Sequence, residues 1–417
     1  MNRRQPIYWM IACGLVLIAA LTAIPHFISA RAILESSVGL FVPADRLEVA
    51  HASPTEVKPS FDAASWYEAH GESKDSHGVL VETLDGSRVL ASLNADLTFN
   101  PASLIKLSTS LVALKKLGAD FHFQTRVLIE GGADSKGAAA ARIYLSGNDP
   151  TFGDAGANLI AKELHARGVE RLSEVVVSPE FCFNFSNNAE ESAGRLAKVL
   201  KLGSPKTSVA DGAGGQLLLV VNSNPLSDIL LYMNARSSNF IAERVGAMVG
   251  GPEGVKQFLV SELHLPPDQV TVERTSGREH NRMTPRGLLM TIRALVEEAR
   301  RQNLDPTDIM PVASDDSGTL RRRFEGTGLE GAVVGKSGTL TQEVDGGMAS
   351  LAGIVYTEDQ GVIVFAILDQ GNQIAGNRLL EDQLLTDVIN SQARPRVVAS
   401  PTPRKLLPST GLHVERE

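Results

Sequence analysis

Cysteine is scarce in this chain of 417 residues, which contains only two. Cys13 lies inside an N-terminal apolar run, so removal of that run would leave Cys182 alone and exclude an intramolecular disulfide or a cysteine-rich metal site. The nine histidines form no His-Glu-x-x-His or similar pairing. We therefore expect no metal site.

The chain also lacks the features of nucleic-acid-binding and nucleotide-dependent proteins. Its net charge is −8, and aromatic residues make up 5% of the chain. No stripe of basic residues interleaved with aromatic residues is present. No Gly-rich phosphate-binding loop is present, which argues against ATP or nicotinamide cofactors. We expect no cofactor and no nucleic-acid partner. The 43% hydrophobic and 21% charged residues are typical of a globular protein.

The N-terminus has the pattern of an export signal. Arg3 and Arg4 precede an apolar run over residues 7–24, and Ala30-Arg31-Ala32 fits a small-x-small cleavage site. The run is long for the core of a signal peptide and borderline for a membrane span. Two alternatives therefore stay open, a cleaved signal peptide and a membrane anchor through residues 7–24. Either predicts that the bulk of the protein lies outside the cytoplasm, in the periplasm or cell envelope.

Composition and periodicity divide the rest of the chain. A hairpin pattern around Asp85-Gly86 leads into a helix that contains Ser103, and alternating strand and helix patterns follow from about residue 122. Residues 183–215, rich in Asn, Ser, Gly and Ala, predict irregular structure, and the prolines after residue 394 predict a disordered tail. The expected parts are a signal peptide or anchor over 1–32, a linker over 33–60, the main domain over 61–121 and 216–393, an inserted subdomain over 122–215, and the tail over 394–417.

Ser103 and Lys106 are the first candidate site residues. Asn100 suits the N-cap and Pro101 the first position of a helix, which places Ser103 in the opening turn. Lys106, three residues later, lies on the same helical face, so its amine can reach the hydroxyl and take its proton. The helix dipole favours a developing alkoxide and a neutral lysine. The alternative is a well-capped core helix in which the two residues are incidental.

Ser237 and Asn239 form a second candidate, just before an apolar helix over residues 240–249. Serine and asparagine are common at helix starts, so capping is the alternative explanation. The Ser-x-Asn pattern also recurs elsewhere in the chain, and only its place between two helical segments favours Ser237.

The third candidate is Lys336-Ser337-Gly338-Thr339, on the first strand of a predicted three-strand antiparallel meander over residues 332–368. Lys336 offers a positive charge to a substrate carboxylate, and Thr339 offers a backbone N–H to a developing oxyanion. Gly338 leaves room for a substrate backbone to pair along the strand. The alternative is a surface strand with one solvated lysine.

Ser-x-x-Lys, Ser-x-Asn and Lys-Ser/Thr-Gly occur here in the order found in serine penicillin-recognising enzymes. The chain resembles that superfamily, and within it the D-alanyl-D-alanine carboxypeptidase/DD-endopeptidase family, the low-molecular-mass class C penicillin-binding proteins. The likeness extends from about residue 75 to about residue 375. The flanking matches are Pro101-Ala102-Ser103, Gly147-Asn148-Asp149-Pro150-Thr151, Asn224-Pro225-Leu226, Met283-Thr284-Pro285-Arg286, Pro311-Val312-Ala313 and Gly318-Thr319-Leu320-Arg321.

The resemblance implies an α+β fold: a β-lactamase/transpeptidase-like domain, in which helices flank an antiparallel sheet, with an inserted smaller α/β subdomain. It implies that Ser103 attacks the carbonyl between the two terminal D-alanines of a peptidoglycan stem peptide. Lys106 takes the proton, kept neutral by burial and by the charge of Lys336. The backbone N–H groups of Ser103 and Thr339 stabilise the oxyanion.

The remaining roles also follow from the resemblance. Ser237 relays a proton to the leaving amine, and Asn239 holds the substrate amide. Lys336, with the hydroxyls of Ser337 and Thr339, holds the terminal carboxylate. The expected partners are peptidoglycan stem peptides, and β-lactam antibiotics as inhibitors that acylate Ser103.

Two features depart from the family pattern. Only 134 positions separate Ser103 from Ser237, where the family usually carries a long insertion. The segment 273–281 replaces the usual Asp-Gly-Ser-Gly turn, which puts its part in the site in doubt.

Three other functions stay open: a catalytically weak penicillin-binding scaffold, a β-lactamase, and an exported esterase or amidase. The sequence also leaves open the choice between carboxypeptidase and endopeptidase.

Overall fold

The computed structural model describes residues 59–131, 140–400, 402 and 404–416. The predicted signal peptide or anchor, with its apolar run 7–24, and nearly all of the linker 33–60 lie outside these residues. Within the described residues, no helix has the length and apolar character needed to cross a membrane.

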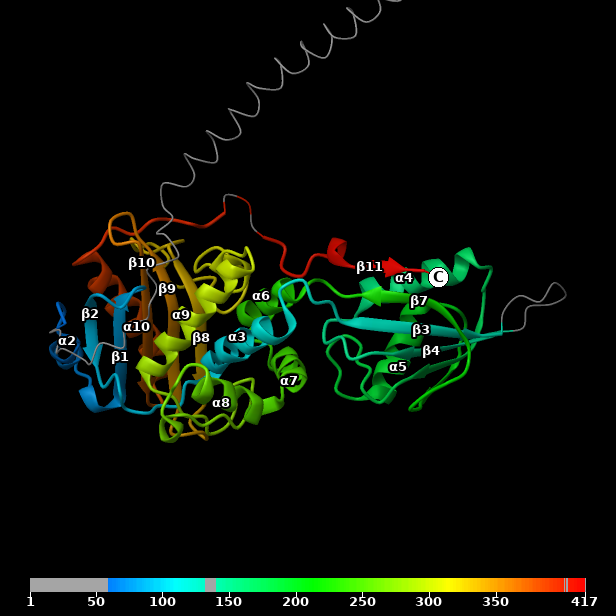
Figure 1. Cartoon of the computed structure of the whole chain (residues 1–417), viewed down its shortest axis with the longest axis horizontal. Helices are drawn as coiled ribbons and strands as arrows, with labels where there is room; N and C mark the ends of the chain where they lie inside the picture. The colour runs from blue at the N-terminus through cyan, green and yellow to red at the C-terminus, as the bar shows by residue number, and fades with distance from the viewer. Residues whose placement is uncertain (1–58, 132–139, 401, 403, 417) are drawn as a thin grey trace, which may run out of the picture. The chain divides into compact units, whose positions relative to one another are not determined.

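The main domain is built on a five-stranded antiparallel sheet in the order β2-β1-β10-β9-β8 (Figure 1). The predicted hairpin and the predicted three-strand meander are both confirmed, because β1 pairs with β2, and β8, β9 and β10 pair in sequence. Gly86, with φ 71°, supplies the left-handed turn of the hairpin. The strands are β1 His77–Thr83, β2 Val89–Leu93, β8 Val333–Leu340, β9 Met348–Tyr356 and β10 Val362–Gln370.

Helices cover both faces of this sheet. Alternate strand residues point to opposite faces, so Val364 of β10 packs in the core beneath α3 and α9, whereas Phe365 packs in the core beneath α2 and α10. Three shorter helices, α6 to α8, pack around α3 (Figure 1). The helices are α2 Ala63–Ala69, α3 Ile105–Leu117, α6 Leu226–Arg236, α7 Asn239–Met248, α8 Gly251–Ser261, α9 Pro285–Arg301 and α10 Ile374–Asn390.

A second sheet, with its own core, follows α3 in the chain. It is mixed and six-stranded, in the order β11-β7-β3-β4-β5-β6. Its parallel pairs, β4 with β5 and β5 with β6, are connected through α4 and α5, as parallel strands require. The elements are β3 Gln124–Glu130, β4 Ala141–Ser146, α4 Asp154–Ala166, β5 Leu172–Val177, α5 Ala189–Leu200, β6 Lys206–Val209, β7 Gln216–Asn222 and β11 His413–Glu415.

The structure corrects the prediction of irregular structure over 183–215. Asn188 caps α5 by accepting a hydrogen bond from the Glu191 backbone N–H at 2.8 Å, and the small apolar face of α5 is buried against β5 and β6. The alanine-rich composition concealed this face. The predicted boundary at residue 215 is also displaced, because β7 pairs with β3 and extends the second sheet to Asn222.

The prediction of a disordered tail over 394–417 is wrong for the part that the structure describes. Arg396 donates its backbone N–H to the Tyr356 carbonyl at 2.8 Å, Arg404 pairs with buried Asp316, and β11 pairs with β7. A strand at the edge of a sheet offers unpaired backbone groups, so a short proline-flanked segment can be ordered by tertiary pairing alone.

Candidate active site

Ser103 lies in a 3-10 turn, η3 (Ala102–Leu104), that leads directly into α3. The Asn100 side chain accepts a hydrogen bond from the Ala102 backbone N–H at 3.0 Å, but the N-cap of this turn is Pro101 and not Asn100, and the α-helix begins only at Ile105. Ala102 and Leu104 are fully buried, whereas Ser103 is half-buried. The turn thus presents the serine hydroxyl and anchors its neighbours.

Lys106 is fully buried, and its amine has three acceptors around it. Nζ donates to Ser103 Oγ at 2.9 Å, to Asn239 Oδ1 at 2.7 Å, and to the backbone carbonyl of Ser276. Burial lowers the pKa of Lys106 from 10.5 to about 7, against the opposing effect of the Glu243 carboxylate and with some help from the Arg278 charge. At neutral pH a substantial fraction of this amine is therefore unprotonated, as a general base must be.

In the Ser237–Asn239 segment, one residue caps a helix and the other two contact the buried lysines. Ser238 caps α7 by accepting a hydrogen bond from the Ile241 backbone N–H at 3.3 Å. Ser237, in a left-handed conformation with φ 51°, ends α6 and accepts a hydrogen bond from Lys336 Nζ at 3.0 Å. The capping explanation therefore fits Ser238, while its two neighbours contact the two buried lysines.

Lys336 lies on β8 and is fully buried, so the alternative of a solvated surface lysine is excluded. Besides Ser237, its Nζ contacts the Ser337 carbonyl at 2.5 Å. Burial holds the pKa of Lys336 well below its usual value, and the charges of Lys106 and Arg378 lower it further. The three sequence motifs thus meet around two buried lysines, and the expected effect of the Lys336 charge on Lys106 is not among the causes of the low pKa of Lys106, where Arg278 supplies the positive charge instead.

The free edge of β8 faces this site. Gly335 donates its backbone N–H to the Pro311 carbonyl at 3.1 Å, on the side away from β9. Backbone N–H groups alternate in direction along a strand, so the N–H of Thr339, four residues on, points toward the same edge. Together with the N–H of Ser103 near the positive end of α3, it could stabilise an oxyanion.

Gly338 lies where the strand β8 packs closely against η3. A Cβ atom there would lie 2.2 Å from Ser350 Oγ and 2.9 Å from both Ala102 Cβ and the Pro101 carbonyl oxygen. The protein itself therefore fills the side-chain position of Gly338. Glycine at this position allows η3 to pack against β8, which brings Ser103 beside the strand.

Sequence reasoning missed several residues of the site. The segment 273–281, whose part in the site was in doubt, does reach the site. The backbone carbonyl of Ser276 accepts a hydrogen bond from the Lys106 amine, and the backbone N–H of Ser276 donates to the Glu243 carboxylate at 3.2 Å. The Ser-Gly pair at 276–277, shared with the family turn, was the available signal. Thr319 Oγ1 accepts from the Ser337 hydroxyl at 2.9 Å, and Arg378 donates to Thr339 Oγ1 at 2.5 Å. Arg378, at an exposed position of α10, gave no signal.

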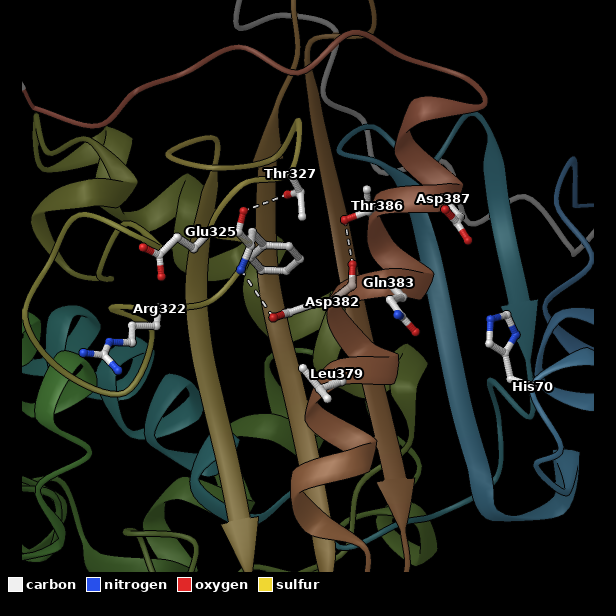
Figure 2. A pocket seen from close by; sticks show the side chains of 10 residues that line it. His70, Arg322, Glu325, Thr327, Leu379, Asp382, Gln383, Thr386 and Asp387 are labelled. Carbon is white, nitrogen blue, oxygen red and sulfur yellow. Dashed lines mark hydrogen bonds between the residues drawn. The ribbon is translucent and has the colours of Figure 1, made fainter.

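A cavity of about 510 Å³ adjoins the site at Asn239, and both acidic and basic side chains line it. A second cavity, of about 410 Å³, lies between the segment 322–327 and α10 (Figure 2). It contains no motif residue, and its Asp382 and Thr386 are engaged by neighbouring groups. The first cavity is lined by Asn187, Asn239, Phe240, Glu243, Arg244, Arg274, Arg278 and Glu279.

Two bacterial proteins of known structure share this fold. A penicillin G-acylated form of a predatory endopeptidase from Bdellovibrio bacteriovorus has a TM-score of 0.68 at 19% identity, over 79% of this chain and 96% of that one. Penicillin-binding protein 4 from Haemophilus influenzae has a TM-score of 0.59 at 17% identity, over 74% of this chain and 96% of that one. At these identities the likeness establishes the fold: a mixed α+β transpeptidase-like architecture.

Two sequence relationships are more specific. A carboxypeptidase of Mycobacterium tuberculosis is 31% identical over 193 residues, and the match spans 42% of this chain and 41% of that protein's length. The family profile described as D-Ala-D-Ala carboxypeptidase 3 (S13) matches residues 65–192 and 196–389, which include all three motifs and most of both sheets. This chain therefore belongs to the D-Ala-D-Ala carboxypeptidase 3 (S13) family.

Proposed function

We propose that this chain is an exported serine peptidase that acts on the D-Ala-D-Ala end of peptidoglycan stem peptides, as a carboxypeptidase, a DD-endopeptidase or both. The observation that carries the proposal is the buried Lys106 amine, 2.9 Å from the Ser103 hydroxyl. Family membership supports it, as do the names of its relatives: a carboxypeptidase in one case and a peptidoglycan endopeptidase in the other.

The first step is acylation of Ser103. Neutral Lys106 takes the hydroxyl proton while Ser103 Oγ bonds to the carbonyl carbon of the penultimate D-alanine. The carbonyl oxygen becomes an oxyanion held by the N–H groups of Ser103 and Thr339. The support for this assignment is the position of Ser103 beside α3 and the outward direction of alternate N–H groups on β8.

The tetrahedral intermediate then collapses and the C–N bond breaks. Ser237 passes a proton to the leaving amine and is replenished from the lysines, in keeping with the 3.0 Å contact between its Oγ and Lys336 Nζ. Asn239 uses Oδ1 to accept from Lys106, which leaves its NH₂ group for a substrate amide carbonyl. Water subsequently hydrolyses the ester on Ser103 and regenerates the enzyme.

The same chemistry predicts inhibition by β-lactams, because their strained amide would acylate Ser103 and leave slowly. The N-terminal sequence pattern, with Arg3 and Arg4 before an apolar run, supports export to the compartment where peptidoglycan lies.

The test is labelling of the full chain with a fluorescent penicillin. We expect wild type and a Ser261→Ala control to be labelled, since Ser261 is an exposed serine at the end of α8. Ser103→Ala should lose the label, and Lys106→Met should acylate at least 100-fold more slowly, the order of magnitude of general-base catalysis. Lys162→Met, at an exposed lysine on α4, is the matched control for the lysine variant.

Two further assays separate the two activities. Release of D-alanine from a pentapeptide measures carboxypeptidase activity, and release of monomers from a cross-linked dimer measures endopeptidase activity. Labelling that persists in Ser103→Ala would contradict the assigned nucleophile. A labelled protein that turns over neither peptide would favour a penicillin-binding scaffold, and rapid recovery from acylation would favour a β-lactamase.

A further inference from the structure

One carboxylate near the candidate active site joins three parts of the chain that are distant in sequence. Asp345 lies half-buried in the loop 341–347 between β8 and β9. Its Oδ1 and Oδ2 accept from the Arg282 guanidinium at 3.0 and 2.8 Å. Oδ2 also accepts from Asn100 Nδ2 at 2.6 Å, and His280 Nδ1 lies 3.0 Å from Oδ1. The loop is therefore bound at one side chain to the segment before α9 and to the residues before η3.

The charge of Asp345 is required for these contacts. Burial opposes its ionisation, but the hydrogen bonds from Arg282, Asn100 and His280 outweigh burial and hold the pKa of Asp345 well below its usual value. The ionised carboxylate only accepts hydrogen bonds, and donors lie at both of its oxygens. An amide in its place would turn its NH₂ group toward a donor in either orientation.

Asn100 extends this anchoring to the residue before the nucleophile. Its side chain is buried, and Nδ2 donates to the Glu279 carbonyl at 2.7 Å as well as to Asp345. Its Oδ1 accepts from the Ala102 backbone N–H at 3.0 Å. Because both N–H donors and the oxygen of the amide are used, its orientation is fixed, with the oxygen toward Ala102.

Ala102 has a backbone conformation that depends on such support. Its φ of 51° is left-handed, which residues with a side chain rarely adopt. It is fully buried and immediately precedes Ser103. Relaxation of Ala102 to an ordinary φ would turn the chain at Ser103 and move its hydroxyl away from the Lys106 amine, which lies 2.9 Å from it.

The part of the segment 273–281 that contacts Lys106 is anchored by other bonds. The Thr275 carbonyl accepts from Thr109 Oγ1 of α3 at 2.8 Å, and its hydroxyl donates to the Ala242 carbonyl of α7 at 3.0 Å. Loss of the Asp345 contacts should therefore leave the surroundings of Lys106, and with them its pKa, unchanged.

We propose that Asp345 is a positioning residue for the nucleophile Ser103 and acts through Asn100. The two side chains hold Ala102 in its left-handed conformation and so keep the Ser103 hydroxyl beside the Lys106 amine. Asp345 is not a catalytic residue in this account, because it acts only through its neighbours. The inference rests on the proposed peptidase function, since acylation of Ser103 is the step that the position serves.

The test measures acylation of the full chain by a fluorescent penicillin. The concentration dependence gives the acylation rate constant and the dissociation constant of the initial complex separately. We expect Asp345→Asn to lower the rate constant at least about tenfold, as small displacements of a reacting group do, and to change the dissociation constant less than about twofold. Asp345→Glu keeps the charge and should recover part of the loss. Asp268→Asn, at an exposed aspartate in η4 (Pro267–Gln269), is the matched control.

Two further measurements separate positioning from other roles. In the pH profile of acylation, Asp345→Asn should lower the plateau and leave the midpoint in place, because the pKa of Lys106 is set by burial and by the charges of Glu243 and Arg278. In a double-mutant cycle, Asn100→Ala combined with Asp345→Asn should be no slower than the slower single variant, because both changes act on the same turn.

Effects that multiply in the double variant, or a midpoint that moves, would overturn the inference, as would acylation of Asp345→Asn at the wild-type rate. Hydrogen exchange of the backbone N–H groups over residues 100–104 needs no activity and should be faster in Asp345→Asn than in the control. If no penicillin labels wild type, the proposed function fails, and exchange still decides whether Asp345 holds the turn. Urea unfolding shows that each variant is folded. If Asp345→Asn does not fold, Asp345→Glu replaces it in the cycle.

Discussion

Lys106 combines complete burial with contacts to three residues from different parts of the chain. Asn239 and Ser276 lie more than a hundred residues away in sequence, yet both accept hydrogen bonds from its amine. The depressed pKa comes first from burial, and the opposed charges of Glu243 and Arg278 adjust it. The reactivity of Ser103 is therefore set by residues that no local motif contains.

The first prediction concerns pH. Because Lys106 has a pKa of about 7 and acts only when neutral, acylation of Ser103 should fall as the pH decreases through about 7 and level off above it. The measurement is the rate constant of acylation by a β-lactam between about pH 5 and pH 9. A rate that does not change across this range would show that Lys106 is not the base.

Two substitutions should shift this profile in opposite directions. Glu243→Gln removes a negative charge that raises the pKa of Lys106, so the midpoint should move to lower pH. Arg278→Gln removes a positive charge that lowers this pKa, so the midpoint should move to higher pH. Lys336 is unchanged in both variants, which makes them matched controls for each other. Shifts of the same sign in both would contradict this electrostatic account.

At the scale of elements, the contact of η3 with β8 fixes the relation of Ser103 to the strand edge. Gly338 permits the contact by lacking a side chain, and the Ser350 hydroxyl reinforces it by donating to the Pro101 carbonyl at 3.0 Å. Gly277 serves the same purpose on the other side, since a Cβ atom there would lie only 1.9 Å from the Ala102 carbonyl oxygen. The nucleophile is thus clamped between two backbone segments.

Gly338→Ala should therefore lower both stability and acylation. The added methyl group forces β8 and η3 apart, and we expect a loss of about 1–3 kcal/mol in the free energy of unfolding. Gly194→Ala makes the same chemical change in α5, where nothing lies near the added atom, and should stabilise by about 0.5–1 kcal/mol. Urea unfolding and penicillin labelling of both variants provide the comparison. Normal acylation by Gly338→Ala would show that the close contact is unnecessary.

At the scale of the whole molecule, the C-terminal segment contacts both sheet-containing parts. Arg404 pairs with Asp316, whose carboxylate also accepts from the Val312 backbone N–H at 2.7 Å, and β11 extends the second sheet beside β7. Asp316 lies three residues before Thr319, which contacts Ser337 in the site. Arg404 thus supports a segment that borders the candidate active site.

Arg404→Gln tests this support. The substitution leaves the buried Asp316 carboxylate without its cation, and we expect a loss of roughly 1–3 kcal/mol in unfolding free energy. Lys405→Gln removes the same charge at the next position, which is exposed, and should change stability by less than about 0.5 kcal/mol. Urea unfolding measures both. Equal stability of the two variants would mean that the tail is not coupled to residues 312–319.

The sequence alone determined the local features of this protein. Glycine turns and alternating apolar strands predict the β1–β2 hairpin and the β8–β10 meander, because these features depend on neighbours within a few residues. The order of three short motifs also indicates the family to which the chain belongs. In the second sheet, α5 and β6 escaped prediction because their apolar faces are narrow and built largely from small residues.

Only the tertiary structure decided which distant residues meet. Arg378 and the ordered tail carry no local signal, since their partners lie far along the chain. The pKa of Lys106 is likewise a tertiary property, because burial and the charges of Glu243 and Arg278 exist only in the folded state. Sequence specifies the groups that can do chemistry, and folding sets their distances and their protonation.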